Sequence, residues 1–133
     1  MDTYKPWLTN FLVSQGGVAG TVHLVRGDLL EMAAAVNIPE SVQTATRVIE
    51  MGKGMAGLAW SRQRPVQTCN LREDTTGDVR PGACAVAAQA AVALPVPGDT
   101  GDVRGVVGIA FTGEREIEMW ELDLLSEAAA SLP

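Results

Sequence analysis

The sequence has 133 residues, of which 47% are hydrophobic, and this predicts one folded domain over 1–133 rather than a disordered chain. A net charge of −6, with the basic residues scattered, argues against nucleic acid and anionic membranes as partners. No apolar stretch reaches the roughly 18 residues that span a bilayer, and the N-terminus lacks the features of a signal peptide. We therefore expect a cytoplasmic protein.

The start of the chain is predicted to form a helix and then a β-hairpin. Apolar residues at helical spacing predict a helix over 7–13, which Gly16 and Gly17 would end. Two apolar runs, 21–25 and 29–36, flank a Gly-Asp turn, as is typical of a hairpin. The run 29–36 also has helical propensity, but the turn directly before it favours a strand.

Shorter elements are predicted for the middle of the chain. A proline and an acidic residue suit the N-terminus of a short helix over 40–47. The segment 48–51 is too short to assign. A glycine-rich turn then leads into a short helix over 58–63, which the next proline stops. The alternation of apolar and polar residues in 66–69 predicts a strand.

The rest of the chain predicts a loop, a second hairpin and a final helix. Segment 71–81 is polar and indicates a loop, and 82–88 has room for one or two helical turns. Strands are predicted over 91–96 and 103–111, and a proline inside the first indicates a bulge or an unpaired position. An apolar stripe predicts a helix over 118–132. Since hairpins force antiparallel pairing, the fold class is α+β.

One glycine motif matches a dinucleotide-binding pattern. Gly52, Gly54 and Gly57 have the required spacing, and Glu73 and Asp74 lie near the position of the ribose-binding acid. That pattern belongs to a strand, a full helix and a parallel strand. Hairpins surround the motif here, and its helix is short, so the sequence argues against a dinucleotide site.

The segment 51–111 resembles a GAF domain. The motifs that carry the resemblance occur in order: the glycine-rich turn into a helix at 52–60, the Arg-Pro-Val-Gln strand entry at 64–67, the Ala-Leu-Pro-Val strand at 93–96 and the Gly-Val-Val-Gly-Ile strand at 105–109. The element order on both sides agrees, so the resemblance covers almost the whole chain. Together the motifs are specific for the fold and not for a ligand.

The resemblance implies a six-stranded antiparallel sheet with flanking helices. The N-terminal and C-terminal helices would pack on one face of the sheet. A ligand pocket would lie on the other face, under the short helices and the segment 71–90. Terminal helices often form homodimers in this family, so we expect a homodimer; the alternative is that these helices only cover the sheet. Trp60 and Trp120 are candidate core residues.

The ligand chemistries of GAF domains find little support in this sequence. The signature of cyclic-nucleotide binders is missing. Bilin binders usually have a cysteine followed by histidine, whereas Ala85 follows Cys84. His23 is expected to be a partly exposed strand residue and not a haem ligand. Cys69 and Cys84 match no zinc spacing and fit reduced, buried thiols. The sequence thus indicates no bilin, haem, NAD or metal, and the cofactor is unknown.

Free methionine-R-sulfoxide reductases are the enzymes that share this fold. Cys84 falls at their catalytic position, but Ala56 stands where their glycine-rich turn has a cysteine, and their upstream cysteine maps near Thr46. Their substrate-binding acids map near three small residues, Ala91, Gly108 and Ala110. A lone thiolate without a resolving thiol or amine-binding carboxylates would turn over poorly. We therefore expect that the chain is not an enzyme.

Three hypotheses for the function follow. The first is a sensor of a small ligand, whose candidate binding residues are Cys69, Thr76, Asp78, Arg80 and Cys84. Arg80 would pair with an anionic ligand, unless the loop's own acids neutralise it. The second is a dimerisation or protein-interaction module without a ligand, which the alanine-rich run 84–93 favours. The third is a methionine sulfoxide reductase that uses Cys84.

Overall fold

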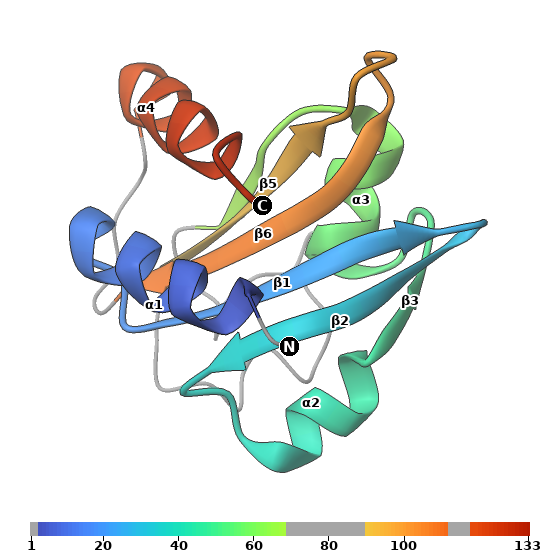
Figure 1. The fold of residues 1–133 in the computed structure, drawn as a ribbon, viewed down its shortest axis with the longest axis horizontal. Helices are drawn as coiled ribbons and strands as arrows, with labels where there is room; N and C mark the ends of the chain where they lie inside the picture. The colour runs from blue at the N-terminus through green and yellow to red at the C-terminus, as the bar shows by residue number, and fades with distance from the viewer. Residues whose placement is uncertain (1–2, 69–89, 112–117) are drawn as a thin grey trace.

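The computed structural model of the chain describes residues 3–68, 90–111 and 118–133. In this part of the chain, six strands form one antiparallel sheet with helices packed on it (Figure 1). The predicted α+β fold with a six-stranded antiparallel sheet is therefore confirmed. No helix among the described residues is both long and apolar enough to cross a bilayer.

The first helix and the first hairpin form as predicted. Helix α1 (Tyr4–Gln15) ends at Gly16, whose φ of 76° is a left-handed conformation that glycine adopts without strain. Strands β1 (Ala19–Arg26) and β2 (Leu29–Val36) pair antiparallel. The turn between them contains Gly27, which also has a positive φ of 64°. The segment with mixed propensity is thus a strand, because the turn fixes it against β1.

Four short elements make up the middle of the chain. Helix α2 (Glu40–Thr46) matches the predicted helix, and the unassigned segment after it forms β3 (Val48–Glu50). Helix α3 (Gly54–Arg62) begins earlier than the predicted start at residue 58. The glycine-rich segment therefore belongs largely to the helix and not to the turn before it. Strand β4 (Val66–Thr68) follows as predicted.

The second hairpin and the final helix complete the fold. Strands β5 (Ala90–Pro97) and β6 (Val103–Phe111) pair antiparallel, and the register shifts at the end of β5, near the bulge that its proline predicted. Helix α4 (Met119–Ala129) begins with a capping box in which Glu118 and Glu121 bond each other's backbone. Two predicted segments lie outside the described residues: the loop 71–81 and the turns 82–88.

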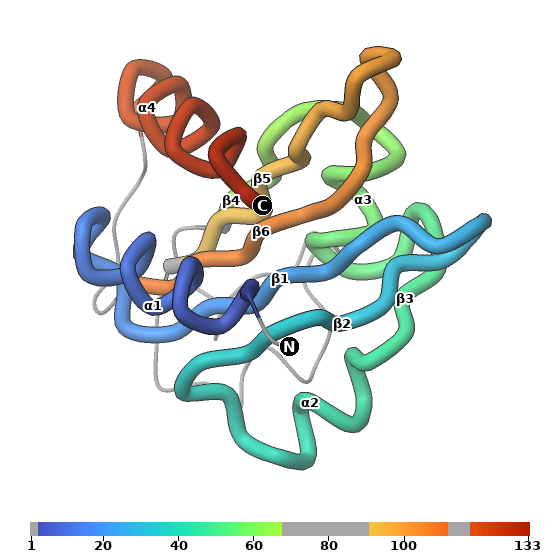
Figure 2. The backbone as a smooth tube through the Cα atoms, viewed as in Figure 1, coloured from blue at the N-terminus to red at the C-terminus, as the bar shows by residue number. Residues whose placement is uncertain are grey.

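The strands are ordered β3-β2-β1-β6-β5-β4, so β1 and β6 lie in the middle of the sheet (Figure 2). Helices α1 and α4 cover one face, as the resemblance implies (Figure 1). Trp7 of α1 donates a hydrogen bond of 3.0 Å to Ser131, just beyond α4. The core on this face is fully apolar and includes Leu8, Leu12, Val22, Leu94, Val107, Leu125 and Ala129.

The other face of the sheet carries α3 and a second core. Trp60 is buried there against the sheet, as predicted, together with Leu30, Ile49 and Val106. Trp120 was predicted for the core as well, but it is 59% exposed on α4. It occupies the outward side of the helix, while Leu125 and Ala129 provide the buried side.

Candidate functional site

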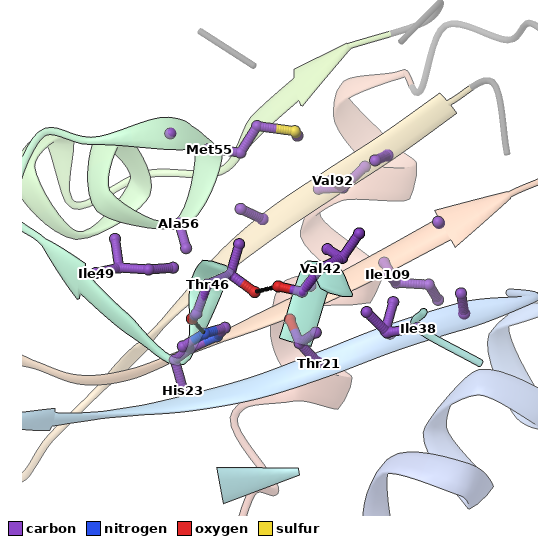
Figure 3. A pocket seen from close by; sticks show the side chains of 17 residues that line it. Thr21, His23, Ile38, Val42, Thr46, Ile49, Met55, Ala56, Val92 and Ile109 are labelled. Atoms are coloured by element: carbon purple, nitrogen blue, oxygen red, sulfur yellow. Dashed lines mark hydrogen bonds between the residues drawn. The ribbon is translucent and has the colours of Figure 1, made fainter. Parts of the chain in front are cut away.

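A cavity of about 150 Å³ lies on the sheet face opposite α1 and α4 (Figure 3). Side chains from β1, β5 and β6 form its floor, and residues of α2, β3 and α3 form its walls. The cavity is thus on the face where the resemblance to GAF domains places a ligand pocket. Its shape follows from the sizes of the residues in these elements.

Small residues make the floor of the cavity. Two rows of paired residues cross the three adjacent strands β1, β6 and β5. The first row is Ala19, Ala110 and Ala91, and the second is Thr21, Gly108 and Ala93. With one threonine as the largest side chain, neither row fills the space between the sheet and the helices above it.

The opposite face of the same strands is built mainly from large residues. In β5, β6 and β1, Leu94 pairs with Val107 and Val107 pairs with Val22, and all three are fully buried under the terminal helices. Val92 and Ile109 form a further large pair in this core, in a row that Gly20 completes, and both residues also border the cavity. Because side chains of a strand alternate between the faces, one sequence provides a dense core on one side and a cavity on the other.

Mainly apolar side chains form the walls. They come from the segment before α2 and from α2, β3 and α3, and Figure 3 shows them around the floor: Ile38, Val42, Thr46, Ile49, Met55 and Ala56. The hydroxyl of Thr46 donates a hydrogen bond of 2.7 Å to the Val42 carbonyl one turn earlier, so it is already engaged within α2. The walls therefore add little polarity to the cavity.

The glycines of the motif at 52–57 have a structural function. Gly52 donates a backbone hydrogen bond of 2.9 Å to the Gly57 carbonyl. A Cβ on Gly57 would lie 2.5 Å from the backbone oxygen of Glu50, so only glycine allows α3 to approach β3 this closely. Every strand pair in the described part of the chain is antiparallel, which agrees with the rejection of a dinucleotide fold.

His23 is buried, and the expectation of a partly exposed strand histidine is wrong. Its side chain is 2% exposed and lies on the cavity face of β1, beneath α2 (Figure 3). Its Nε2 is 2.8 Å from the backbone oxygen of Thr46, at the end of α2. The carbonyl accepts, so Nε2 must donate, and this fixes the tautomer of the neutral ring. Burial lowers the pKa of His23 below its ordinary value of 6.5, although the hydrogen bond to Thr46 opposes this shift.

The described lining of the cavity contains no charged side chain. Its polar side chains are those of Thr21, His23 and Thr46. No group of three His, Cys, Asp or Glu residues that would hold a metal ion occurs in the described ranges. The arrangement suits a small apolar molecule with few polar atoms, since binding sites of this kind combine apolar walls with a few placed polar groups.

The candidate ligand residues predicted from the polar loop remain predictions. They all lie outside the described residues: Cys69, Thr76, Asp78, Arg80 and Cys84. By contrast, five positions that the resemblance matched to reductase residues come together in the cavity lining: Thr46, Ala56, Ala91, Gly108 and Ala110. The sequence reasoning missed His23 and Thr21 as site residues. Their spacing of two on a strand places both on one face, and this was the available signal.

The chain resembles solved structures with the GAF fold, although a scan against family models and a comparison with curated proteins both find no match. A type II free methionine-R-sulfoxide reductase from Thermoplasma acidophilum has a TM-score of 0.77 at 17% identity, over 96% of this chain and 87% of the other. The GAF domain of an Acinetobacter phosphoenolpyruvate-protein phosphotransferase has a TM-score of 0.77 at 14% identity, over 98% of this chain and 78% of the other.

A third similar structure is the free methionine-R-sulfoxide reductase of Neisseria meningitidis in complex with its substrate, with a TM-score of 0.69 at 20% identity over 92% of this chain and 73% of the other. The chain therefore has the GAF fold. Similar structures include both regulatory domains and enzymes, so the fold alone does not decide between these functions.

Proposed function

We propose that the chain is a regulatory module of the GAF type, which senses a small molecule bound in the cavity over the sheet. The observation that carries this proposal is the contrast between the two sheet faces. The rows that meet α1 and α4 include large residues such as Leu94 and Val107, whereas the two rows that form the cavity floor are built from alanine, glycine and one threonine.

The lining of the cavity is almost entirely apolar. A ligand that covers this surface in the folded state would stabilise the protein, which couples ligand binding to stability.

A titration followed by methyl NMR tests the proposal. Ile38, Val42 and Ile49 provide methyl groups in the cavity walls, and Val13 provides one on the exposed side of α1. A small-molecule panel should contain compounds that shift the cavity methyl signals and leave Val13 unchanged. If every compound leaves the cavity methyls unchanged or shifts exposed methyls equally, the proposal is wrong.

We further propose that the module is not catalytic. Cys84 matches the catalytic thiol of the reductases, but the positions that match their other thiols and their carboxylates carry Thr46, Ala56, Ala91, Gly108 and Ala110, which provide neither a thiol nor an acid. Turnover of free methionine-R-sulfoxide should be absent or equally slow in the wild type and in Cys84→Ala. Turnover that is fast and lost in Cys84→Ala would contradict this.

A second candidate function, dimerisation, has its own observation. Large apolar side chains are exposed on the terminal helices: Val13 on α1, and Met119, Trp120 and Leu124 on α4. Apolar groups that cluster on a surface often mark a protein interface. A dimer through these helices is compatible with a ligand in the cavity, because the cavity lies on the other face of the sheet.

A further inference from the structure

The hydroxyl of Thr21 is an available hydrogen-bonding group in the lining of the cavity. The other two polar side chains of the described lining are already engaged. The Thr46 hydroxyl donates to the Val42 carbonyl at 2.7 Å, and Nε2 of His23 is bonded to the Thr46 carbonyl at 2.8 Å. Oγ1 of Thr21 has no hydrogen-bond partner among the described residues and, unlike Nδ1 of His23, is not buried by the protein.

The strand pairing places this hydroxyl over the floor of the cavity. Thr21 on β1 pairs with Gly108 on β6, which pairs with Ala93 on β5, so the three residues belong to one row of the floor (Figure 3). A Cβ added to Gly108 would lie 2.9 Å from Oγ1 of Thr21 and within 4 Å of no other side chain among the described residues. The missing side chain of Gly108 therefore leaves a notch in the floor, and the Thr21 hydroxyl borders this notch.

The chemistry around the notch limits the class of ligand. The described lining contains no charged side chain, so a charged ligand would lose hydration without gaining an opposite charge from these residues. A purely apolar ligand would cover the Thr21 hydroxyl and leave it unpaired, which costs free energy. A ligand that combines an apolar body with an uncharged hydrogen-bonding group avoids both costs. Because a hydroxyl both donates and accepts, either a donor or an acceptor on the ligand can bond it.

We propose that the cavity binds an uncharged, mainly apolar molecule whose polar group forms a hydrogen bond with Oγ1 of Thr21 above Gly108. This inference rests on the proposed function, namely that the cavity binds a ligand. It names the class of that ligand and the residue that selects it. The apolar body of the ligand lies against the mainly apolar walls that α2, β3 and α3 provide.

Phenol and toluene are suitable probes, because they have almost the same shape and differ in one hydroxyl. Their association constants are measured by NMR titration of the cavity methyl signals of Ile38, Val42 and Ile49, in the wild type and in Thr21→Val. Valine retains the shape of threonine and lacks the hydroxyl. The phenol-to-toluene ratio of association constants should fall about fivefold in Thr21→Val, as expected for one lost hydrogen bond. Comparing the ratio between proteins cancels the difference in hydration between the probes.

A second pair of variants repeats the test without valine. Thr21→Ser retains the hydroxyl and Thr21→Ala lacks it, so the ratio should be higher in the serine variant. Thr9→Val is the control, because Thr9 is exposed on α1, on the other face of the sheet, and its hydroxyl bonds the Lys5 carbonyl. Thr9→Val should have the ratio of the wild type. Equal ratios in the wild type and Thr21→Val, or in the serine and alanine variants, would overturn the inference.

The test also separates this inference from the proposed function. If both probes shift the cavity methyl signals but the ratio does not depend on the hydroxyl of Thr21, the cavity binds ligands and only the inference is wrong. If neither probe binds the wild type, the inference is also wrong, while the proposed function is decided by the wider panel and the same methyl signals. Only when that panel also fails are both rejected.

Discussion

The ring of His23 on β1 is bonded to the backbone of Thr46 at the end of α2, with Nε2 and the carbonyl oxygen 2.8 Å apart. This bond connects the middle of the sheet to the helix that forms one wall of the cavity. It also determines which nitrogen of the ring remains as an acceptor. One hydrogen bond thereby affects both the position of α2 and the chemistry of the site.

The first prediction concerns the pH dependence of stability. Burial lowers the pKa of His23 in the folded state below the 6.5 of the unfolded chain. Below pH 6.5 the unfolded state therefore binds more protons, and the free energy of unfolding decreases until the pH reaches the folded-state pKa. Above 6.5, His23 adds no pH dependence. Urea unfolding between about pH 7.5 and about pH 5.5 measures this decrease.

Carboxyl groups add their own acid dependence, so the control is a comparison with His23→Gln. This variant cannot titrate at position 23 and retains a donor for the Thr46 carbonyl. Its free energy of unfolding should decrease less than that of the wild type over the same pH range, whatever its absolute stability. Parallel pH profiles for the two proteins would show that His23 does not titrate differently on folding.

The second prediction concerns Gly57. A Cβ at this position would lie 2.5 Å from the Glu50 backbone oxygen, which is too close for any real contact. Gly57→Ala should therefore reduce the free energy of unfolding by about 1–3 kcal/mol, even though alanine is normally the better helix former. Ser61→Ala on the exposed side of α3 is the control and should change it by less than about 0.5 kcal/mol. If Gly57→Ala is as stable as the wild type, the conclusion that α3 packs too closely on β3 for a Cβ at position 57 is wrong.

The third prediction concerns the attachment of the C-terminus. Arg104 on β6 donates hydrogen bonds to the backbone oxygens of Leu132 at 2.6 Å, Pro133 at 3.2 Å and Pro97 at 3.3 Å. Arg104→Ala should lower stability by about 1 kcal/mol or more. Arg104→Lys should lose less stability than Arg104→Ala but remain less stable than the wild type, because an ammonium group lacks the planar fork that reaches several acceptors.

Amide hydrogen exchange localises this effect. The amide of Leu132, which bonds the Ala129 carbonyl at 3.0 Å, should exchange faster in Arg104→Ala. The amide of Val107 in the middle of β6 should be affected only through global unfolding. A loss of protection that is uniform over both sites would mean that Arg104 acts on the whole fold and not on this end of the chain.

The fourth prediction concerns the proposed dimer. Trp120 and Met119 are 59% and 74% exposed on α4. If these side chains form the interface, Trp120→Glu should shift the sedimentation of the protein from dimer to monomer. Met51→Glu, at an exposed position in the turn before α3, is the control and should sediment like the wild type. A wild type that sediments as a monomer at all concentrations would reject the dimer.

The fold was predictable because its signals are local. Hairpin turns, the apolar stripe of the last helix and the ordered GAF-like motifs each specify their own segment. The start of α3 was missed because the glycines at 52–57 suggested a turn, whereas tertiary packing against β3 extends the helix back to Gly54. Trp120 was missed because the apolar stripe of α4 does not show which of its large residues point outward.

The site was harder to predict, because it depends on residues from distant strands. The alternation of small and large residues in Ala91-Val92-Ala93-Leu94 is visible in the sequence, but the cavity exists only because Gly108 and Thr21 lie in the same row as Ala93. The burial of His23 depends on α2 crossing above it, which no local pattern specifies. Sequence reasoning instead selected the polar loop, where chemically reactive side chains are most frequent.

Native mass spectrometry of the protein as purified from cells tests the central claim, ligand binding in the cavity, most directly. Ala91→Leu fills the floor of the cavity, and Ala45→Leu makes the same change on the exposed side of α2. The account predicts a reproducible additional mass per chain in the wild type and in Ala45→Leu that is lost in Ala91→Leu. A folded wild type that carries no additional mass and acquires none from a metabolite panel, or an additional mass that persists in Ala91→Leu, would contradict it.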